Sequence, residues 1–374
     1  MRVGIDARLW NESGVGRYTR NLIFELQKID RGTEYVLFAL HKDFDNILSQ
    51  IKNPNVRVIG TNIRWHSLSE QVQLPHMLYK QKLDLMHFPY FSVPIIYNKP
   101  FVVTIHDLIL HHFSTGEAST LSFPIYRAKH MGYSFIMSQA ARRAKKIITI
   151  LESTKQEIVD HLGVEKNKIS VMYEGVDKKV IGDDADKVPA SVKKPFILHV
   201  GNVYPHKNAD RLVEAFDIFS KEDKLIQLVF VGRTDYFQRR LKKKIHTLAS
   251  RERITFVGEV SDGELSQLYR NAAALFIPSL MEGFGLPAVE AMANACIVIA
   301  SDIPSLKEVC KNAALYFDPY NTESLVNMLR IVTAKKKQEF RENIRAGQKR
   351  VLDFSWEKMA KETQALYENC ISLR

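Results

Sequence analysis

The sequence predicts an α/β protein made of two doubly wound parallel sheets in series. Short apolar runs alternate with longer segments of helical spacing. The alternation stops after residue 180 and then begins again. Alternating strands and helices are typical of parallel sheets joined by crossover helices. A length of 374 residues favours two domains over one large α/β unit.

Seven apolar runs form the first set of expected strands. They are 2–7, 34–40, 56–60, 84–88, 101–106, 146–150 and 169–173. Between them, residues 15–29 and 68–82 have helical spacing. Residues 181–195 combine charge, Gly, Pro and Ala without periodicity, which predicts an interdomain linker.

Six further runs form the second set. They are 196–201, 226–232, 254–260, 274–278, 296–301 and 314–317. The final stretch, 355–371, predicts an amphipathic helix with Ser355 as its N-cap, long enough to cross back onto the first domain. We therefore assign residues 1–185 with 355–374 to the first domain and 186–354 to the second. Two such sheets are expected to bind ligands at their carboxyl edges, which would face each other across a cleft.

The composition excludes several classes of protein. Charged residues make up 25% and apolar residues 45%, so disorder, collagen and coiled coil are excluded. Lys and Arg exceed Asp and Glu, 53 against 42, but the excess is shared by both halves. Without a basic tail we expect no nucleic-acid partner, and the diffuse positive charge suits anionic small molecules or a membrane surface.

Three cysteines form no CxxC pair, which favours a reducing compartment. The opening MRVGIDARLW does not read as a signal peptide, and no window approaches about 18 apolar residues. We expect a cytoplasmic protein that touches a membrane only at its surface.

The most informative segment is PSLMEGFGLPAVEAM, residues 278–292. A strand is expected to end just before it, and Pro287 suits the first turn of a helix. The backbone amides of Phe284, Gly285 and Leu286 would then point outward at a helix N-terminus, where they could bind a diphosphate.

Two carboxylates flank this expected anion site. Glu282 precedes the helix and Glu290 lies within it, so both could accept hydrogen bonds from sugar hydroxyls. A plain strand–turn–helix would explain Glu290 as an acid favoured by the helix dipole. It would not explain the Glu-Gly-Phe-Gly loop.

The spacing Glu282-x7-Glu290 within EGFGLPAVEAM resembles the donor-site signature of the family 4 retaining glycosyltransferases, which have the GT-B fold. Similar features extend from GVGRY at 14–18 to SWEKMA at 355–360. The segments GIDARLW, GVGRYTRNL, TIHDL and G-x4-HKN are most similar to bacterial mannosyltransferases of the O-antigen and exopolysaccharide type.

The resemblance implies roles for three donor-site residues. Glu290 would hydrogen-bond the ribose of a nucleotide, and Glu282 a hydroxyl of the transferred hexose. Lys207, expected to open a helix, would contact the donor phosphates and neutralise charge on the departing diphosphate. Without the resemblance, Lys207 could equally be a solvated lysine at a helix start.

The segment that begins at Gly201 departs from the family pattern. Many relatives have an Arg directly after this glycine, where this chain has Asn202. Arg233, at the end of the next strand, and His206 are therefore candidates for a second cation beside the diphosphate.

Gly14 and Gly16 follow the first strand and open a helix. Thr19 replaces the third glycine of a dinucleotide fingerprint, and the second strand ends without an acid, so a dehydrogenase is not favoured. The resemblance places the two glycine amides near the donor phosphates or the acceptor. Tight helix–strand packing is the alternative.

His106 ends a buried strand and should face the ligand crevice. The resemblance implies that it lies against the donor sugar, with Asp107 orienting the ring or a loop. A structural histidine is the alternative.

No metal site is predicted. His111 and His112 are adjacent, point apart and lack a third ligand at helical spacing, and the Asp-x-Asp pairs at 43–45 and 184–186 lie in loops. We expect no metal or other cofactor, with the nucleotide-diphosphate sugar as co-substrate.

Residues 118–151 contain no acid but six cations interleaved with aromatic and methionine side chains. The cations are Arg127, Lys129, Arg142, Arg143, Lys145 and Lys146. One interpretation is a basic amphipathic helix on an anionic membrane. The other is a core-facing aromatic stripe with a solvated basic face.

The resemblance therefore implies a retaining, metal-independent glycosyltransferase with His106, Lys207 and Glu282 as catalytic residues. It would transfer mannose from GDP-mannose to a glycan or lipid-linked saccharide, in the cytoplasm or on the inner face of the membrane. The alternatives are a UDP-sugar donor, a sugar-phosphate epimerase or phosphorylase of the same fold, and a catalytically idle scaffold. Departures at 294–297 and at Lys307, where relatives often have Cys-Gly-Thr-Pro and Pro, mark an unusual member.

Overall fold

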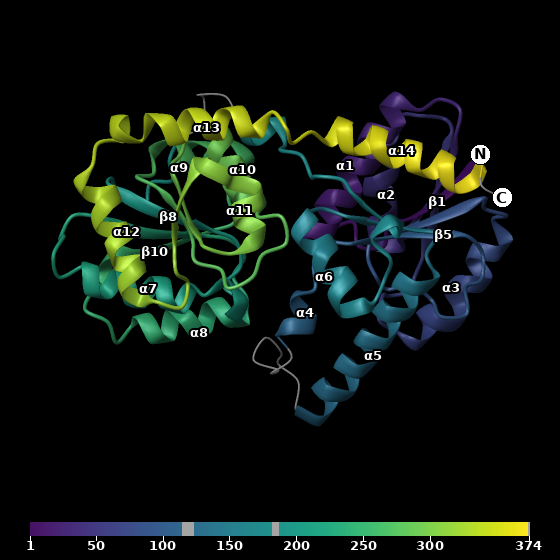
Figure 1. Ribbon diagram of the computed structural model, residues 1–374, viewed down its shortest axis with the longest axis horizontal. Helices are drawn as coiled ribbons and strands as arrows, with labels where there is room; N and C mark the ends of the chain where they lie inside the picture. Colours follow the sequence, from purple (N-terminus) through teal and green to yellow (C-terminus); the bar gives the residue numbers. More distant parts are fainter. Residues whose placement is uncertain (114–122, 182–186, 373–374) are drawn as a thin grey trace. The chain divides into compact units, whose positions relative to one another are not determined.

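The computed structural model describes residues 1–113, 123–181 and 187–372. These residues form two compact units, each with its own sheet (Figure 1). The first contains 1–113, 123–175 and 355–372, and the second contains 176–181 and 187–354. The division falls at 175/176, whereas the sequence placed it at 185/186. Residues 178–181 pack with the second unit, where Arg270 and Asn294 donate hydrogen bonds to their carbonyls.

The first unit is built on a seven-stranded parallel sheet in the order β3-β2-β1-β4-β5-β6-β7. The strands are β1 (Arg2–Asp6), β2 (Glu34–Leu40), β3 (Val56–Thr61), β4 (Leu85–Phe88), β5 (Phe101–Ile105), β6 (Lys146–Thr149) and β7 (Ile169–Val171). All seven expected strands are confirmed.

Helices cover both faces of this sheet. They are α1 (Gly14–Ile29), α2 (His41–Gln50), α3 (Leu68–Lys80), α4 (Ile109–His112), α5 (Phe123–Arg143), α6 (Glu152–Leu162), the 3-10 turn η1 (Lys166–Lys168) and α14 (Trp356–Ser372). One core cluster joins α3, α5 and α6 to alternate residues of the strands. Residues of the opposite parity face the other side, where His87 of β4 bonds to Tyr367 of α14.

The C-terminal helix α14 belongs to the first unit, as predicted. The hydroxyl of Ser355 accepts a hydrogen bond from the amide of Lys358, which confirms it as the N-cap. At the other end of the helix, the ammonium group of Lys145 donates to the carbonyl of Cys370. The helix packs against α1.

The second unit has a six-stranded parallel sheet in the order β10-β9-β8-β11-β12-β13. Its strands are β8 (Phe196–Val200), β9 (Gln227–Val231), β10 (Ile254–Gly258), β11 (Leu275–Ile277), β12 (Val298–Ser301) and β13 (Ala314–Phe317). Again every expected strand is present.

The helices of the second unit follow the same alternating pattern. They are α7 (Ala209–Phe219), α8 (Tyr236–Ile245), α9 (Asp262–Asn271), α10 (Leu286–Ala293), α11 (Pro304–Cys310), α12 (Thr322–Ala334) and α13 (Arg341–Val351). The 3-10 turns among the described residues of this unit are η2 (Lys178–Ile181), η3 (Pro205–Lys207), η4 (Arg251–Arg253), η5 (Lys311–Ala313) and η6 (Lys337–Phe340).

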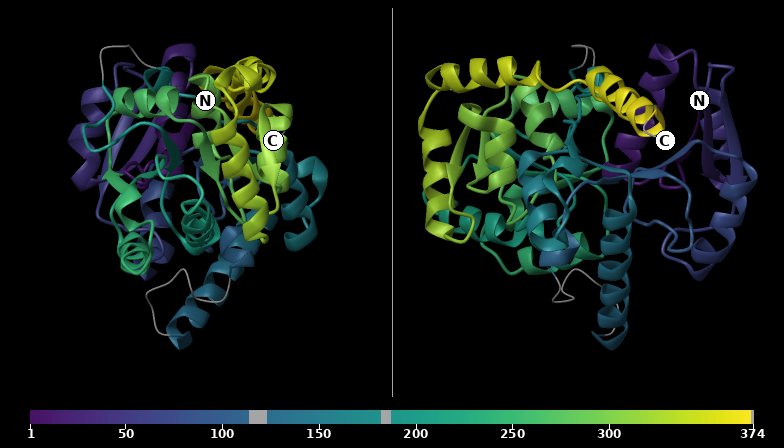
Figure 2. Two further views of the ribbon diagram at one scale, coloured as in Figure 1. Left: turned by 90° about the vertical axis from the view of Figure 1, so that its left-hand side faces the viewer. Right: turned by 45° about the vertical axis from the view of Figure 1, so that its right-hand side comes forward.

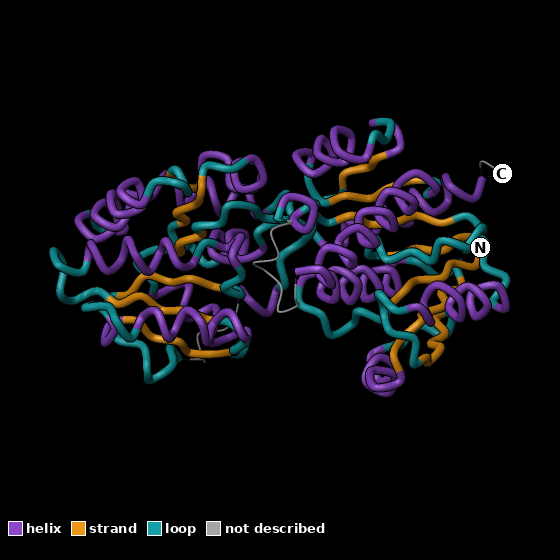
Figure 3. The backbone as a smooth tube through the Cα atoms, turned by 90° about the horizontal axis from the view of Figure 1, so that it is seen from below, coloured by secondary structure: helices purple, strands orange, loops and turns teal. Residues whose placement is uncertain are grey.

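Both strand orders reverse direction once, between β1 and β4 and between β8 and β11. Figure 3 shows the strands of each unit in orange, between layers of helices. In a doubly wound sheet, ligands bind at the carboxyl ends of the strands beside such a switch point. The predicted donor residues follow β8 and β11, and His106 follows β5.

Among the described residues, no helix is both long enough and apolar enough to cross a membrane.

Candidate functional site

Lys207 and Glu282 form an ion pair in the second unit. The Lys207 ammonium lies 2.6 Å from Oε2 of Glu282, and the hydroxyl of Ser279 donates to the other carboxylate oxygen at 2.8 Å. Their side chains are 20% and 8% exposed. Lys207 follows β8 and Glu282 follows β11, two strands that are neighbours at the switch point. The structure thus brings together the two residues expected to contact the donor phosphates and the hexose.

Asn208 holds these two loops together. Its backbone is in the left-handed conformation, with φ of 57°, and its side-chain amide donates to the carbonyls of Pro278 and Pro319 at 3.0 Å each. The amide of Leu280 donates to the carbonyl of His206 at 2.7 Å. Backbone and side-chain bonds therefore fix the loop of Lys207 against the loop of Glu282.

Lys207 does not open a helix, contrary to the sequence prediction. It ends the 3-10 turn η3, and α7 begins two residues later at Ala209. The left-handed Asn208 separates the two elements, because a residue in that conformation cannot continue a right-handed helix.

Burial and the Lys207 charge shift the pKa values of Glu282 and of His206, the residue before Lys207. Burial raises the pKa of Glu282, but the charge of the adjacent Lys207 and the hydrogen bonds from Lys207 and Ser279 act together against burial, so this pKa lies below its ordinary value. Burial and the Lys207 charge lower the pKa of His206 to about 4. The His206 ring is therefore neutral at neutral pH in the free protein, and its role as a second cation beside the diphosphate stays a prediction.

The N-terminus of α10 has the predicted form. Gly285 is the N-cap residue with φ of 77°, and Pro287 lies in the first turn. Within the described chain, the amides of Gly285 and Leu286 donate to no protein acceptor. The side chain of Phe284 is buried, and its ring meets that of Phe354 edge-on at 5.2 Å. This helix end has the amide geometry that binds anions.

Glu290 lies inside α10 and is only 2% exposed. The hydroxyl of Tyr269, from α9, donates to its carboxylate at 2.8 Å. Asn294 donates to the backbone carbonyl of the same residue. Glu290 is thus not a surface acid at a helix start, and a neighbouring helix fixes its orientation.

The remaining donor-site candidates of the second unit are Gly201 and Asn202, which follow β8, and Arg233, which follows β9. Gly201, after β8, has φ of 129°, and a side chain here would meet no atom within 4 Å. Next to it, Oδ1 of Asn202 is buried and has no hydrogen-bond donor in the described residues. Arg233 is exposed after β9 and makes no ion pair within the part of the chain that the structure describes. It thus stays a candidate for the second cation.

In the first unit, His106 directly follows β5 and is 9% exposed. Its Nε2 lies 2.9 Å from the carbonyl oxygen of Pro89, and its Nδ1 lies 3.5 Å from a carboxylate oxygen of Glu174. The Tyr18 ring meets it edge-on at 4.9 Å. Both ring nitrogens thus face acceptors, so the ring is held in one orientation.

A buried chain of polar side chains runs from α14 toward His106. The hydroxyl of Tyr367 bonds to Nδ1 of His87, and Nε2 of His87 bonds to the hydroxyl of Thr104 at 2.8 Å. Thr104 in turn lies 3.2 Å from the hydroxyl of Tyr18. Burial lowers the pKa of His87 to about 3, so this ring is neutral. The C-terminal helix therefore helps to position the packing partner of His106.

The two glycines of the first unit have different environments. A side chain at Gly16 would lie 2.5 Å from the carbonyl oxygen of Trp10, so this glycine is needed for close packing. A side chain at Gly14, the first residue of α1, would meet nothing within 4 Å. Gly14 is the one of the pair whose backbone a ligand could approach, and the phosphate role of both stays a prediction.

Among the described residues, no group of three or more His, Cys, Asp or Glu side chains could hold a metal ion. His161 of α6 lies beside His111 and His112, with ring centroids 5.1 and 4.9 Å away, a proximity that the sequence did not predict. The expected independence from metal stays a prediction, as do the roles of the individual site residues.

Three contributing residues were missed at the level of sequence. Ser279 and Glu174 each lie just beyond a strand, at the carboxyl edge of a sheet, and that position could have marked them. Tyr269 lies within α9, and nothing in the sequence connects it with Glu290.

Comparison with known families identifies both units. The family described as glycosyltransferase family 4 matches residues 13–180, and the family described as glycosyl transferases group 1 matches residues 181–351. A curated relative is the O-antigen chain mannosyltransferase RfbU of Salmonella typhimurium. It is 28% identical over 321 residues, which are 83% of this chain and 85% of the relative.

Solved structures share the fold. Sucrose-phosphate synthase from Thermosynechococcus elongatus covers 100% of both chains with a TM-score of 0.79 and 21% identity. The Anabaena protein HepE, solved in complex with UDP and glucose, has a TM-score of 0.76 and 17% identity, and the match covers 99% of this chain and 100% of that one. The chain therefore belongs to the family 4 glycosyltransferases of the GT-B fold and is a glycosyltransferase.

Proposed function

We propose that this glycosyltransferase moves mannose from GDP-mannose to a glycan or lipid-linked saccharide in the synthesis of a cell-surface polysaccharide. The similarity to an O-antigen chain mannosyltransferase over most of both chains supports the sugar and the pathway class. The observation that carries the reaction type is the Lys207–Glu282 pair beside the free amides of α10. A cation, a helix N-terminus and a hydroxyl acceptor there suit a nucleoside diphosphate sugar.

In this proposal each residue has a distinct task. Lys207 and the amides of Gly285 and Leu286 stabilise the departing diphosphate, and Glu290 accepts hydrogen bonds from the ribose. Glu282 and His106 orient the hexose. Because Lys207 is bonded to Glu282 in the free protein, donor binding must exchange part of that contact for the phosphates.

The reaction proceeds with retention and without a metal ion. The acceptor oxygen attacks from the face that the diphosphate leaves, and the departing phosphate oxygen takes the acceptor proton. The new glycosidic bond replaces the bond from the anomeric carbon to the phosphate oxygen, so the step is balanced without a protein base. Lys207 and the helix dipole supply the positive charge that a divalent cation would otherwise supply. Activity should thus persist in EDTA.

A UDP-sugar is the second candidate for the donor, since HepE, of the same fold, was solved with UDP and glucose. The base and the sugar are therefore the first quantities to test.

A thermal-shift panel of GDP, UDP, ADP and dTDP would distinguish these donors. A ligand at a hundred times its Kd adds about 2.7 kcal/mol to the folded state. We expect GDP alone to raise Tm, by roughly 2–4 °C for each kcal/mol. Glu290→Ala should abolish the shift, whereas Glu252→Ala, at an exposed position of the same unit, should preserve it.

The other outcomes each change the proposal. A shift with UDP alone would keep the enzyme class and replace the donor. No shift with any nucleotide, from folded protein, would favour an idle scaffold of this fold.

A further inference from the structure

We propose that the outward sides of α3 and α5 form a surface that binds an anionic lipid membrane. The inference rests on the proposed function, in which the acceptor can be linked to lipid, and it assigns the docking face to particular residues of the first unit. We use the name α3–α5 surface for these outward sides together with residues 95–99, which belong to the loop between β4 and β5.

The six cations of the acid-free stretch 118–151 fall into two groups in the structure, one bonded to backbone carbonyls and one exposed to solvent. Residues 118–122 of this stretch lie outside the described part of the chain. Arg143 donates to the carbonyls of Ile95 and Tyr97, Lys145 to that of Cys370, and Lys146 to that of Asn167. Those three cations hold the unit together. Arg127, Lys129 and Arg142 are the ones left exposed to solvent.

The aromatic and methionine side chains of α5 are divided in the same way. Tyr133 packs edge-on against Phe91 at 4.7 Å, and Met137 is buried in the core. Met131 and Phe135, in contrast, are 66% and 54% exposed. One side of the helix is therefore the core-facing aromatic stripe of the second interpretation, and the other side presents exposed apolar and basic side chains to solvent.

The exposed side of α5 has a definite order. Arg127, Met131, Phe135 and Arg142 follow one another at intervals of four, four and seven residues, which places them in one row along the helix. Two large apolar side chains thus lie in solvent between two arginines. Within the described residues, neither guanidinium has an acidic partner. The N-terminal turns of α5 extend away from the rest of the first unit (Figures 1 and 2).

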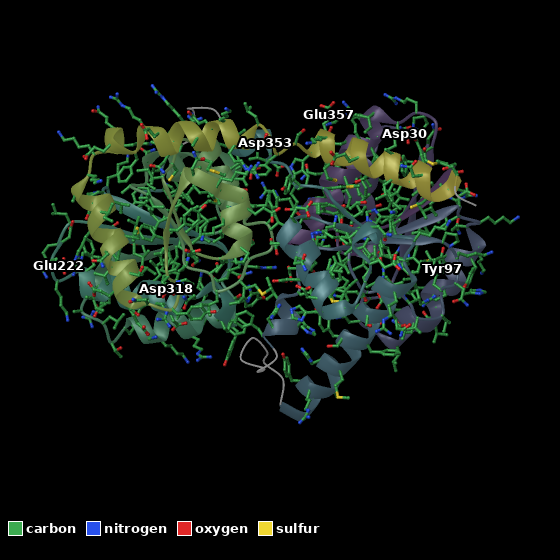
Figure 4. All side chains as sticks on the ribbon, viewed as in Figure 1. Asp30, Tyr97, Glu222, Asp318, Asp353 and Glu357 are labelled. Atoms are coloured by element: carbon green, nitrogen blue, oxygen red, sulfur yellow. The ribbon has the colours of Figure 1, made fainter. Side chains whose placement is uncertain are left out.

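The α3 helix continues this character on the same face of the sheet. Leu68, Val72 and Tyr79 are 88%, 67% and 39% exposed and share one side of the helix. The two helices contribute to one core cluster. They are joined by Tyr97, labelled in Figure 4, whose ring lies 5.4 Å from Tyr79 and whose carbonyl accepts from Arg143.

Charge decides which occupant fits this surface. The helix α5 contains no acid, and the single acid of α3, Glu70, is fully buried and paired with Arg8 at 2.7 Å. Lys80, Lys82 and Lys99 are exposed at the C-terminal end of α3 and in the loop between β4 and β5. Apolar side chains between unpaired cations match the interface of an anionic bilayer, where the acyl region takes the former and the headgroups the latter. A second copy of this chain would bring the same positive charges against each other.

Co-sedimentation of the full chain with vesicles tests the proposal. We expect binding to vesicles that contain phosphatidylglycerol, little binding to phosphatidylcholine alone, and release by salt. Arg127→Gln with Arg142→Gln should weaken binding by about fivefold for each cation, thus about 25-fold together. Met131→Ser with Phe135→Ser should weaken it at least about tenfold.

Two matched controls use exposed residues of the second unit. Arg239→Gln with Arg240→Gln removes the same charge, and Leu225→Ser removes an apolar side chain that is 78% exposed. Both should bind vesicles as the unaltered chain does. Equal binding to the two kinds of vesicle, or equal loss in the controls, would overturn the proposal.

Further measurements separate this inference from the proposed function. The GDP-induced Tm shift should be unchanged in all α5 variants, so loss of vesicle binding with an intact shift leaves the donor assignment standing. Vesicle binding without any nucleotide-induced Tm shift would support the membrane surface and contradict the donor assignment. If light scattering instead finds a dimer that Met131→Ser with Phe135→Ser dissociates, the surface is a self-association interface and the membrane proposal is wrong.

Discussion

Lys207 and Glu282 are 75 positions apart in the sequence and form an ion pair of 2.6 Å at the carboxyl edge of the second sheet. The pair joins the loop after β8 to the loop after β11, which are adjacent only because the strand order reverses there. Its lysine is partly exposed and its glutamate is nearly buried. The cation is thus oriented by a partner that is itself expected to contact the sugar.

Lys207→Ala should lower kcat by about 10²–10³-fold, because a charge that stabilises the leaving diphosphate is lost. Lys207→Arg should retain part of the activity, since it keeps the charge and changes the geometry. Lys243→Ala, at an exposed position on α8, is the matched control. Steady-state kinetics with GDP-mannose would measure kcat for each variant. An unchanged kcat in Lys207→Ala would remove Lys207 from the mechanism.

Glu282→Gln should lower the free energy of unfolding at pH 7 by about 1–3 kcal/mol, since it weakens a bond to a charged group. The pKa of Glu282 is lower in the folded state than its ordinary value of 4.5. Its contribution is therefore present above pH 4.5 and is lost as the pH falls through the folded pKa. Urea unfolding would measure the free energy of unfolding at pH 7 and near pH 3. The difference in this free energy between the variant and the unaltered chain should be smaller near pH 3. Glu214→Gln, at an exposed carboxylate paired with Lys244, should show a much smaller difference at both pH values.

Glu174→Gln tests whether Glu174 positions His106. If the carboxylate holds the ring, kcat should fall by up to about 10²-fold, because a small misplacement of a reacting group costs that much. The KM for the donor should change little, so the loss should fall on kcat alone, which a merely structural role would not produce. Glu165→Gln, at an exposed residue of the same unit, is the control. If Glu174→Gln lowers Tm so far that unfolding accounts for all of the lost activity, the positioning role is contradicted.

Ala295→Gly should stabilise the protein. Ala295 has φ of 53°, which costs an L-residue about 1–2 kcal/mol. The greater freedom of glycine in the unfolded chain offsets about 0.4–1 kcal/mol. We expect a net gain of about 0.5–1 kcal/mol in thermal unfolding. Ala293→Gly, two residues earlier at the end of α10, should instead destabilise, and a fall in Tm with both would show that the methyl group of Ala295 is needed for packing.

The sequence predicted the strands of both sheets and the start of α10 well, because both depend on local patterns. Alternation of apolar runs and helical segments specified every strand of both sheets, and Gly285 and Pro287 marked the start of α10. Local spacing does not determine which side of a helix is covered. The cations of residues 118–151 therefore could not be divided into structural and exposed ones until Arg143, Lys145 and Lys146 were seen bound to carbonyls.

By itself, the sequence determined that this is a family 4 glycosyltransferase with two parallel sheets, since the family pattern and the hydrophobic periodicity are properties of the chain alone. Only the tertiary structure decided the partners of the site residues: Ser279 and Lys207 for Glu282, Tyr269 for Glu290, and Glu174 for His106. The physical reason is that most of these contacts join distant segments. Their distances are set by the order of strands in a sheet and by helix packing, which no local pattern encodes.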